Sequence, residues 1–374
     1  MTVLLAPDKF KGSLTAREVC EALTRGLLRA RPELDVLAHP MADGGDGSLA
    51  VLRAHRPLTE RRIATTDPLG RPIQASYFVD VDGAAYVELP AASGLVLLAE
   101  GERDPLATTT LGTGTLVADA IARGARCVYL FLGGSATNDA GMGIAVALGL
   151  RFFDASGHAL APCGKALIEV DRMDLTNLIP WVREMDFRIL VDVSNPLYGP
   201  TGAAHAFARQ KGADAAAVEL LDAGLRRFAG RLTEATGVRV DELAGGGAAG
   251  GIAAGLAALF GARVEEGFGY LAEATGLAAR IATADVVVTG EGRLDATSLG
   301  GKVVGGVARL CREAGKPLHA VAGAVALTAA EREVLRLRSV HAVMDRAADE
   351  ADAMGRAGEI LKEIGVELGG RLPT

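Results

Sequence analysis

Seven carboxylates stand in or beside glycine-rich segments of this 374-residue chain, most of them just after a stretch that is predicted to be a strand. They are Asp8, Asp43, Asp46, Asp139, Asp192, Glu291 and Asp295. In an open α/β sheet, loops at the carboxyl ends of the strands gather around a ligand. Mg²⁺ takes one or two carboxylates together with phosphate oxygens and water, so acids beside phosphate-cradling glycines are typical of Mg²⁺-assisted phosphoryl transfer.

The most concentrated of these segments is Leu130–Gly143, which reads LFLGGSATNDAGMG. An apolar run precedes it, and a helix is expected to follow. Glycine lets the backbone approach an anion, and the N-terminus of a helix presents unpaired N–H groups. The alternative is an ordinary tight turn between a strand and a helix. We expect four residues of the segment to bind phosphate or substrate, namely Gly133, Gly134, Ser135 and Asn138.

Lysine is rare here, with seven residues against 32 arginines, yet Lys9, Lys11 and Lys302 all lie in the acid-and-glycine segments. A compact ammonium is a useful partner for a phosphate or a carboxylate. The alternative is that each is a surface lysine or the partner of a neighbouring acid. The clustering favours a role in binding an anionic substrate.

Composition excludes several classes of protein. The net charge is −7 without a basic run, so nucleic acid and anionic membranes are poor partners. Four cysteines without a CxxC pair, and an N-terminus too polar for an export signal, predict a cytoplasmic protein. The uncharged stretch 243–262 is mostly Gly and Ala, which favours a glycine loop and a buried helix over 252–259 rather than a membrane span.

Well-known catalytic motifs are missing. Gly301-Lys302 is the nearest approach to a GxxxxGK[ST] phosphate loop, but Ala296 and Val303 replace the required Gly and Ser/Thr. Neither a GxSxG nucleophile motif nor the protein-kinase set is present. The acids and glycines therefore have to supply the chemistry.

Strands alternate with helices at both ends of the chain. Strands are expected at 3–6, 34–37, 285–289 and 318–321, and helices at 16–31, from 48, and at 303–314. Between them, 61–98 has alternating runs broken by Asp82-Gly83, a hairpin signal. We therefore expect an α/β protein whose first and last portions share one parallel sheet, with the middle inserted and a boundary near residue 60.

Six motifs, in order over nearly the whole chain, resemble the bacterial glycerate kinase family: APDKFKGSLTA, MADGGDGS, LGGSATNDAGMG, DVSNPLYGPTGA, GGGAAGG and TGEGRLDATSLGGK. The resemblance implies ATP-dependent phosphorylation of D-glycerate, usually at the 2-hydroxyl, to give 2-phosphoglycerate and ADP. It also implies a split flavodoxin-like (Rossmann-like) domain over 1–60 and 285–374. An inserted α/β domain containing antiparallel strands would span 61–284, with the active site in the cleft between the domains.

Roles can then be assigned as hypotheses, with ATP and Mg²⁺ as cofactors. Asp192 is the favoured base for the substrate hydroxyl, Asp8 and Asp295 are its rivals, and Lys9 joins Asp8 among the catalytic candidates. The metal candidates are Asp43, Asp46 and Glu291. The candidates for binding substrate or phosphate groups are the 133–138 segment, Lys11, Asn195, Asp295 and Lys302.

Three alternatives stay open at this point. The product could be 3-phosphoglycerate, the acceptor could be another small hydroxy acid, or the protein could bind a small acid without chemistry. Nucleotide preference and oligomeric state are equally open, with a homodimer among the options.

Overall fold

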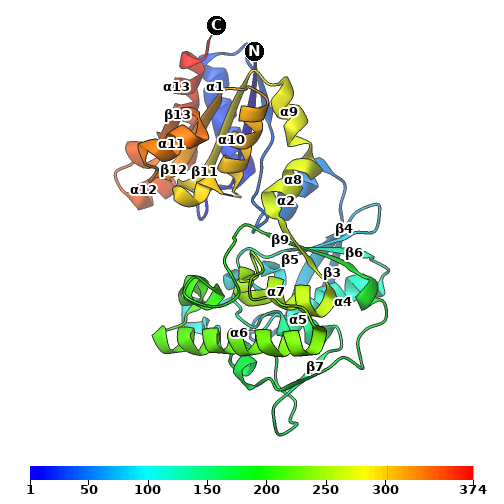
Figure 1. Cartoon of the computed structure of the whole chain (residues 1–374). Helices are drawn as coiled ribbons and strands as arrows, with labels where there is room; N and C mark the ends of the chain where they lie inside the picture. Colours follow the sequence, from blue (N-terminus) through cyan, green and yellow to red (C-terminus); the bar gives the residue numbers. More distant parts are fainter. Residues whose placement is uncertain (301, 374) are drawn as a thin grey trace. The chain divides into compact units, whose positions relative to one another are not determined.

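The computed structural model describes residues 1–300 and 302–373, which form two compact units (Figure 1). Unit 1 contains Met1–His55 and Glu266–Thr374, and unit 2 contains Arg56–Glu265. Each is an α/β structure built around its own sheet. The expected fold class is confirmed: a parallel-sheet domain split in sequence, and an inserted domain that contains antiparallel strands.

Unit 1 has a five-stranded parallel sheet in the order β13-β12-β11-β1-β2. Its strands are β1 (Thr2–Pro7), β2 (Asp35–Ala38), β11 (Val286–Leu294), β12 (Leu318–Val325) and β13 (Leu337–Ala342). This is the flavodoxin-like order, in which the chain leaves the first strand on one side and returns on the other. The reversal falls between β1 and β11, and such a switch point is where open α/β sheets bind ligands.

Helices cover both faces of that sheet. They are α1 (Ala16–Ala30), α2 (Ser48–His55), α8 (Gly267–Thr275), α9 (Leu277–Thr283), α10 (Val303–Glu313), α11 (Ala329–Leu335), α12 (Glu350–Gly355) and α13 (Ala357–Arg371). The expected capping box is present, because Thr15 and Glu18 cap α1 reciprocally. Helices α1 and α13 pack together against one face, in a core with Val3 and Leu5 of β1.

The units change over at 55/56 and 265/266, whereas the sequence places the domain boundaries at 60/61 and 284/285. Helices α8 and α9 account for most of the difference, since α8 contacts α2 and α10 while α9 contacts β1. The Gly44 and Gly267 backbones touch so closely that a Cβ on Gly44 would lie 2.5 Å from the Gly267 Cα. No change in composition marks the boundary at 265/266, so the sequence alone does not locate it.

Unit 2 has a six-stranded mixed sheet in the order β10-β9-β6-β5-β4-β3. Its strands are β3 (Thr59–Thr66), β4 (Pro72–Val79), β5 (Ala85–Glu88), β6 (Cys127–Phe131), β9 (Asp186–Val191) and β10 (Arg263–Glu266), and β7 (Arg151–Phe153) pairs separately with β8 (Arg172–Asp174). Strands β5, β6 and β9 are parallel, whereas β3-β4-β5 is antiparallel. The hairpin predicted at Asp82-Gly83 joins β4 to β5, and Gly83 has the positive φ of 82° that such a turn needs.

Helices in unit 2 are α3 (Pro90–Ser93), α4 (Leu111–Ala122), α5 (Met142–Ala147), α6 (Ala215–Thr236) and α7 (Ala248–Phe260). Shorter 3₁₀ and π turns complete both units, at Leu95–Leu97, Glu100–Glu102, Gly164–Glu169, Val182–Glu184, Ala204–Ala208, Arg209–Lys211, Ala296–Leu299 and Met344–Arg346.

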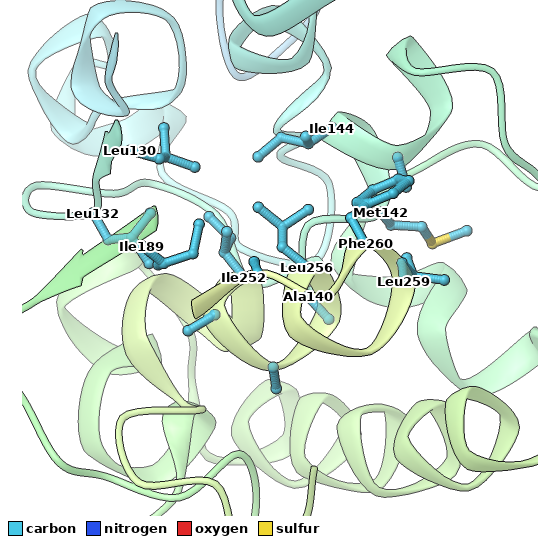
Figure 2. Packing of buried hydrophobic residues seen from close by; sticks show 14 of the residues in the cluster. Leu130, Leu132, Ala140, Met142, Ile144, Ile189, Ile252, Leu256, Leu259 and Phe260 are labelled. Atoms are coloured by element: carbon cyan, nitrogen blue, oxygen red, sulfur yellow. The ribbon is translucent and has the colours of Figure 1, made fainter. Parts of the chain in front are cut away.

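Helix α7 confirms the expectation for the uncharged stretch. Ala249, Gly250 and Gly251 have left-handed backbone angles, so regular turns begin only at Ile252. Figure 2 shows Ile252 and Leu256 in the core among side chains from β6 and β9. Of the helices within residues 1–300 and 302–373, none is both long enough and apolar enough to cross a membrane.

Close packing of α7 gives a stability prediction. A methyl carbon at Gly255 would lie 1.9 Å from the Ala140 carbonyl oxygen, so Gly255→Ala should lower the free energy of unfolding by about 1–3 kcal/mol. Gly230 in α6 is exposed with no atom within 4 Å of such a carbon, so Gly230→Ala should raise it by about 0.5–1 kcal/mol. Urea unfolding of both variants checks this, and equal shifts in the same direction would contradict it.

Candidate active site

Two buried carboxylates lie at the switch point of the unit 1 sheet. Asp8 directly follows β1, and its backbone N–H donates to the Gly290 carbonyl of β11 at 2.8 Å. Glu291 is the next residue of β11, so parallel pairing brings the two acids to the same edge. Each is only 6% exposed. A third acid, Asp43, lies in the loop after β2, and its charge acts on both Asp8 and Glu291.

Burial and mutual repulsion disturb the ionisation of these acids. Burial is the largest cause that raises the Asp8 pKa, to about 8, and Asp43 is the next. The Glu291 pKa rises to about 7, again mainly through burial, with a side-chain hydrogen bond from Ser298 and the charge of Lys302 acting in the opposite direction. The Glu291 Oε1 atom is buried and has no hydrogen-bond partner among the described residues. An unsatisfied buried carboxylate beside two further acids is costly without a cation.

The donor set fits Mg²⁺ better than a metal held by protein alone. No group of three or more His, Cys, Asp or Glu side chains in the part of the chain that the structure describes could hold a metal by itself. Mg²⁺ needs only one or two carboxylates when phosphate oxygens and water complete its shell. The unpartnered Oε1 of Glu291 and the carboxylates of Asp8 and Asp43 provide that minimum.

The remaining acids and lysines of unit 1 are more exposed. Lys9 donates to the Asp46 carbonyl, and its Nζ lies 3.8 Å from Asp46 Oδ2. The Asp46 side chain is 59% exposed, and its contacts with Lys9 hold that lysine in place. Lys11 is exposed and Lys302 is half-buried immediately before α10. Asp295 accepts hydrogen bonds from the N–H and hydroxyl of Thr297, which lower its pKa and make it the N-cap of a short turn.

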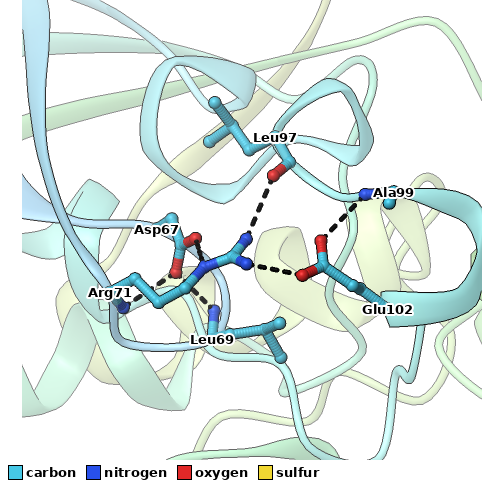
Figure 3. Close-up of polar contacts among 6 residues, drawn as sticks. All are labelled: Asp67, Leu69, Arg71, Leu97, Ala99 and Glu102. Atoms are coloured by element: carbon cyan, nitrogen blue, oxygen red, sulfur yellow. Dashed lines mark hydrogen bonds and ion pairs between the residues drawn. The ribbon is translucent and has the colours of Figure 1, made fainter.

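In unit 2 the 133–139 segment is held from several sides. The Gly134 carbonyl accepts from Leu95 N–H at 2.9 Å, and Ala136 N–H donates to the Ser93 carbonyl at 2.9 Å. Figure 3 shows how the turns after Leu95 are themselves fixed. The Arg71 guanidinium donates to three oxygens, those of Asp67, Leu97 and Glu102. Hydrogen bonds therefore fix the segment at the carboxyl end of β6.

The prediction that the helix after this segment presents unpaired N–H groups to an anion is wrong. Helix α5 has only six residues, and the protein's own Asp139 carboxylate accepts from the Gly141 and Gly143 N–H groups. The same carboxylate accepts from the N–H and hydroxyl of Thr110. Asp139 is completely buried and serves as an internal staple, so it offers neither a metal ligand nor a free helix end.

The GGGAAGG segment serves packing. A Cβ at Gly250 would lie 2.3 Å from the Thr137 carbonyl oxygen and 2.5 Å from the Asn138 Cα. The Gly250 carbonyl accepts from Ala140 N–H at 3.0 Å. Small residues are needed here so that one backbone can lie against another. These glycines therefore support the 133–139 segment.

The segment after β9 delivers Asp192 and Asn195. Asp192 is half-buried directly beyond the last residue of the strand. The Asn195 side-chain N–H donates to the Thr201 carbonyl at 2.8 Å, and the Asn195 backbone carbonyl accepts from Gly247 N–H at 3.0 Å. Asn195 thus shapes the loop that follows Asp192, and Asp192 is the acid that this strand end presents.

Sequence reasoning missed Lys211. Its side chain is 2% exposed, and its Nζ donates to Ser135 Oγ and to the Thr137 carbonyl, both at 2.7 Å. Next to it, neither side-chain polar atom of Asn138 has a partner among the described residues, and Asn138 is 0% exposed. Lys211 follows no strand and belongs to none of the quoted motifs, so only the rarity of lysine in this chain pointed toward it.

Comparisons with known proteins identify the family of this chain. The glycerate kinase family model matches residues 3–371. The chain is 39% identical over 326 residues to the glycerate 2-kinase of Escherichia coli K12, covering 87% of this chain and 86% of that one. It is 39% identical over 329 residues to a glycerate kinase of Bacillus subtilis 168, covering 87% and 85%. A crystal structure of a protein assigned as glycerate kinase 2 from Salmonella typhimurium LT2 superposes with a TM-score of 0.80 at 35% identity, covering 99% of this chain and 97% of that one. The chain belongs to the glycerate kinase family.

Proposed function

We propose that this enzyme transfers the γ-phosphoryl group of ATP to the 2-hydroxyl of D-glycerate, giving 2-phosphoglycerate and ADP. The observation that carries the proposal is the buried Oε1 atom of Glu291, which has no hydrogen-bond partner among the described residues and belongs to a carboxylate on which Asp8 and Asp43 act electrostatically, because acids gathered at one edge of the sheet favour a divalent cation. That cation would come with the nucleotide. The printed name of the Escherichia coli relative, glycerate 2-kinase, supports the 2-position.

Unit 1 supplies the nucleotide's surroundings. Asp8, Asp43 and Glu291 would hold Mg²⁺, which when bound neutralises charge on the β- and γ-phosphates. A cavity of about 330 Å³ opens beside Lys11 at the carboxyl ends of β11 and β12. Phe10, Val343 and Met344 give it an apolar wall, and its size suits a nucleoside base. Lys11 then lies where it can neutralise phosphate charge.

Unit 2 supplies the groups for the acceptor. Asp192 accepts the proton of the 2-hydroxyl while that oxygen forms its bond to phosphorus and the bond to the ADP oxygen breaks. The other two candidates for this role are weaker. Asp8 is already assigned to the metal in this proposal, and Asp295 uses its carboxylate as a cap. Ser135 and Asn138 bind the substrate.

The test is a product assay. Purified protein is incubated with ATP, Mg²⁺ and D-glycerate, and the phosphoglycerate isomer is identified by ³¹P NMR. The expected signal is 2-phosphoglycerate, absent when EDTA replaces Mg²⁺ or when L-glycerate replaces the D-isomer. A 3-phosphoglycerate signal would overturn the position of transfer. No ATP consumption with D-glycerate would overturn the proposed activity itself.

A further inference from the structure

We propose that Lys211 is a positioning residue for the carboxylate of D-glycerate and acts through the hydroxyl of Ser135. The inference rests on the proposed function and deepens it, because it names the group that makes the 133–139 segment an oxyanion site. Three observations carry it: the direction of the hydrogen bonds, the missing counter-ion, and the unsatisfied polar groups around the lysine.

The direction of the hydrogen bonds follows from the chemistry of an ammonium group. A charged lysine has three N–H donors and no acceptor. Its two contacts at 2.7 Å therefore run from Nζ to Ser135 Oγ and to the Thr137 carbonyl. The Ser135 oxygen already accepts a bond, so its own hydrogen is left for a third partner. Lys211 thus turns Ser135 into a donor aimed at an anion.

The ammonium of Lys211 forms no ion pair with a carboxylate of the described residues. Among the described residues no carboxylate oxygen lies within ion-pair distance of Nζ. The charge of Asp139 acts on the lysine, but the Asp139 carboxylate already accepts four hydrogen bonds, from Thr110, Gly141 and Gly143. An ammonium buried without a paired anion is costly, and a bound carboxylate removes that cost. Burial lowers the Lys211 pKa to about 7.

Buried polar atoms without partners occur in residues next to these contacts in sequence or backbone packing. They are the side-chain O and N of Asn138, the Thr137 hydroxyl and Arg103 Nε, all buried and without a partner among residues 1–300 and 302–373. The backbone of Arg103 packs against Gly212, the residue after Lys211, since a Cβ at Gly212 would lie 2.1 Å from the Arg103 carbonyl oxygen. Asn138 offers a donor and an acceptor together. A hydroxy acid satisfies both, whereas an ionised phosphate offers only acceptors, so the site favours glycerate.

Proton binding provides a signature that a purely structural lysine would not give. Above pH 7 free Lys211 loses its proton, and an anion that binds must restore it. The dissociation constant for glycerate should rise by up to about tenfold per pH unit above pH 7, and binding at pH 8 should take up at least about half a proton. Asp139 is the titratable group that acts electrostatically on Lys211. Burial raises the Asp139 pKa, and the hydrogen bonds from Thr110, Gly141 and Gly143 act in the opposite direction. Burial also raises the pKa of Cys163, on which Asp139 acts. Loss of proton uptake in Lys211→Met assigns the proton to the lysine.

The experiment is calorimetric titration of the nucleotide-free protein with D-glycerate at pH 8, in two buffers of different ionisation enthalpy. Wild type should take up protons. Lys211→Met should bind glycerate about 10–100-fold more weakly with no uptake, and Ser135→Ala about tenfold more weakly with uptake retained. Lys165→Met, a change at an exposed lysine of the same unit, should match wild type. In steady-state kinetics the loss should fall on KM for glycerate rather than on KM for ATP.

Each other outcome decides the matter. Wild-type affinity and proton uptake in a folded Lys211→Met protein would overturn the inference, and a loss confined to KM for ATP would overturn glycerate as the ligand. If Lys211→Met does not fold, wild-type uptake with weakened binding in Ser135→Ala supports the inference, and their absence overturns it. Glycerate binding with proton uptake but no phosphorylation would contradict the proposed function and leave this inference standing.

Discussion

Replacing Asp192 by Asn should lower kcat by about 10²–10⁴-fold, because a positioned general base contributes about that much to proton transfer. Asn keeps the size and one hydrogen-bonding oxygen of the side chain but cannot take the proton of the 2-hydroxyl. KM for both substrates and the melting temperature should stay near their wild-type values. Steady-state kinetics with thermal unfolding of the same preparation measures all of these.

Asp186 provides the matched control. It stands at the opposite end of the same strand, β9, where it pairs with Arg188 and Arg263. Asp186→Asn should cost some stability through these ion pairs but leave kcat within about threefold, since surface pairs contribute about 0–1 kcal/mol. Near-normal turnover in Asp192→Asn would transfer the role of base to another group.

Replacing Glu291 by Gln should change activity and stability in opposite directions. Loss of a carboxylate from the metal site should lower kcat by roughly 10²-fold or more and raise the Mg²⁺ concentration needed for half-maximal activity. The metal-free protein should nevertheless unfold at a higher temperature at pH 8, because a buried charge whose Oε1 atom lacks a hydrogen-bond partner among the described residues is gone. Scanning calorimetry in EDTA and activity titrated with Mg²⁺ test the two halves separately.

The sign of the pH effect follows from the raised pKa values. Between pH 4.5 and about 7 the folded protein keeps a proton on Glu291 that the unfolded chain has lost, so the free energy of unfolding falls as pH rises through that range. Asp8 acts in the same direction between 3.8 and about 8. Metal-free protein should therefore lose stability toward pH 8, and Glu291→Gln should lose less of it.

Glu313 gives the control for this pair of effects. It is an exposed acid at the end of α10 in the same unit, within 3.5 Å of Arg309. Glu313→Gln should leave the Mg²⁺ requirement and the pH dependence unchanged. If Glu291→Gln also leaves the Mg²⁺ requirement unchanged, Glu291 does not hold the metal.

The sequence was most informative where local chemistry decides the structure. The Thr15–Glu18 capping box, the Asp82-Gly83 hairpin and the buried helix from Ile252 depend on neighbouring residues, and all three are confirmed. One parallel sheet shared by the first and last portions of the chain also followed from alternating strands and helices, and the structure shows β1 and β11 as neighbours in it. This pairing, which the sequence did not predict, places Asp8 and Glu291 at the same edge.

Features that depend on tertiary contacts were beyond the reach of pattern reasoning. A carboxylate in a glycine loop looks the same whether it awaits a ligand or caps its own backbone, which is why Asp139 looked like a site residue. The glycines at 250 and 255 likewise show their purpose only through the backbone that they touch. Lys211 reaches Ser135 across 76 residues, and no local spacing records such a contact.

The split of unit 1 has a consequence for how the chain is made. Strand β1 lies between β2 and β11, and the Thr289 hydroxyl bonds to the Ala6 carbonyl across 283 residues. A ribosome adding about 5–20 residues per second needs roughly 15–60 s to deliver that neighbour. All of unit 2 emerges during this interval, so it can finish folding while the first strand still has an open edge. Chaperone capture of nascent chains should therefore be strongest before residue 294 leaves the exit tunnel.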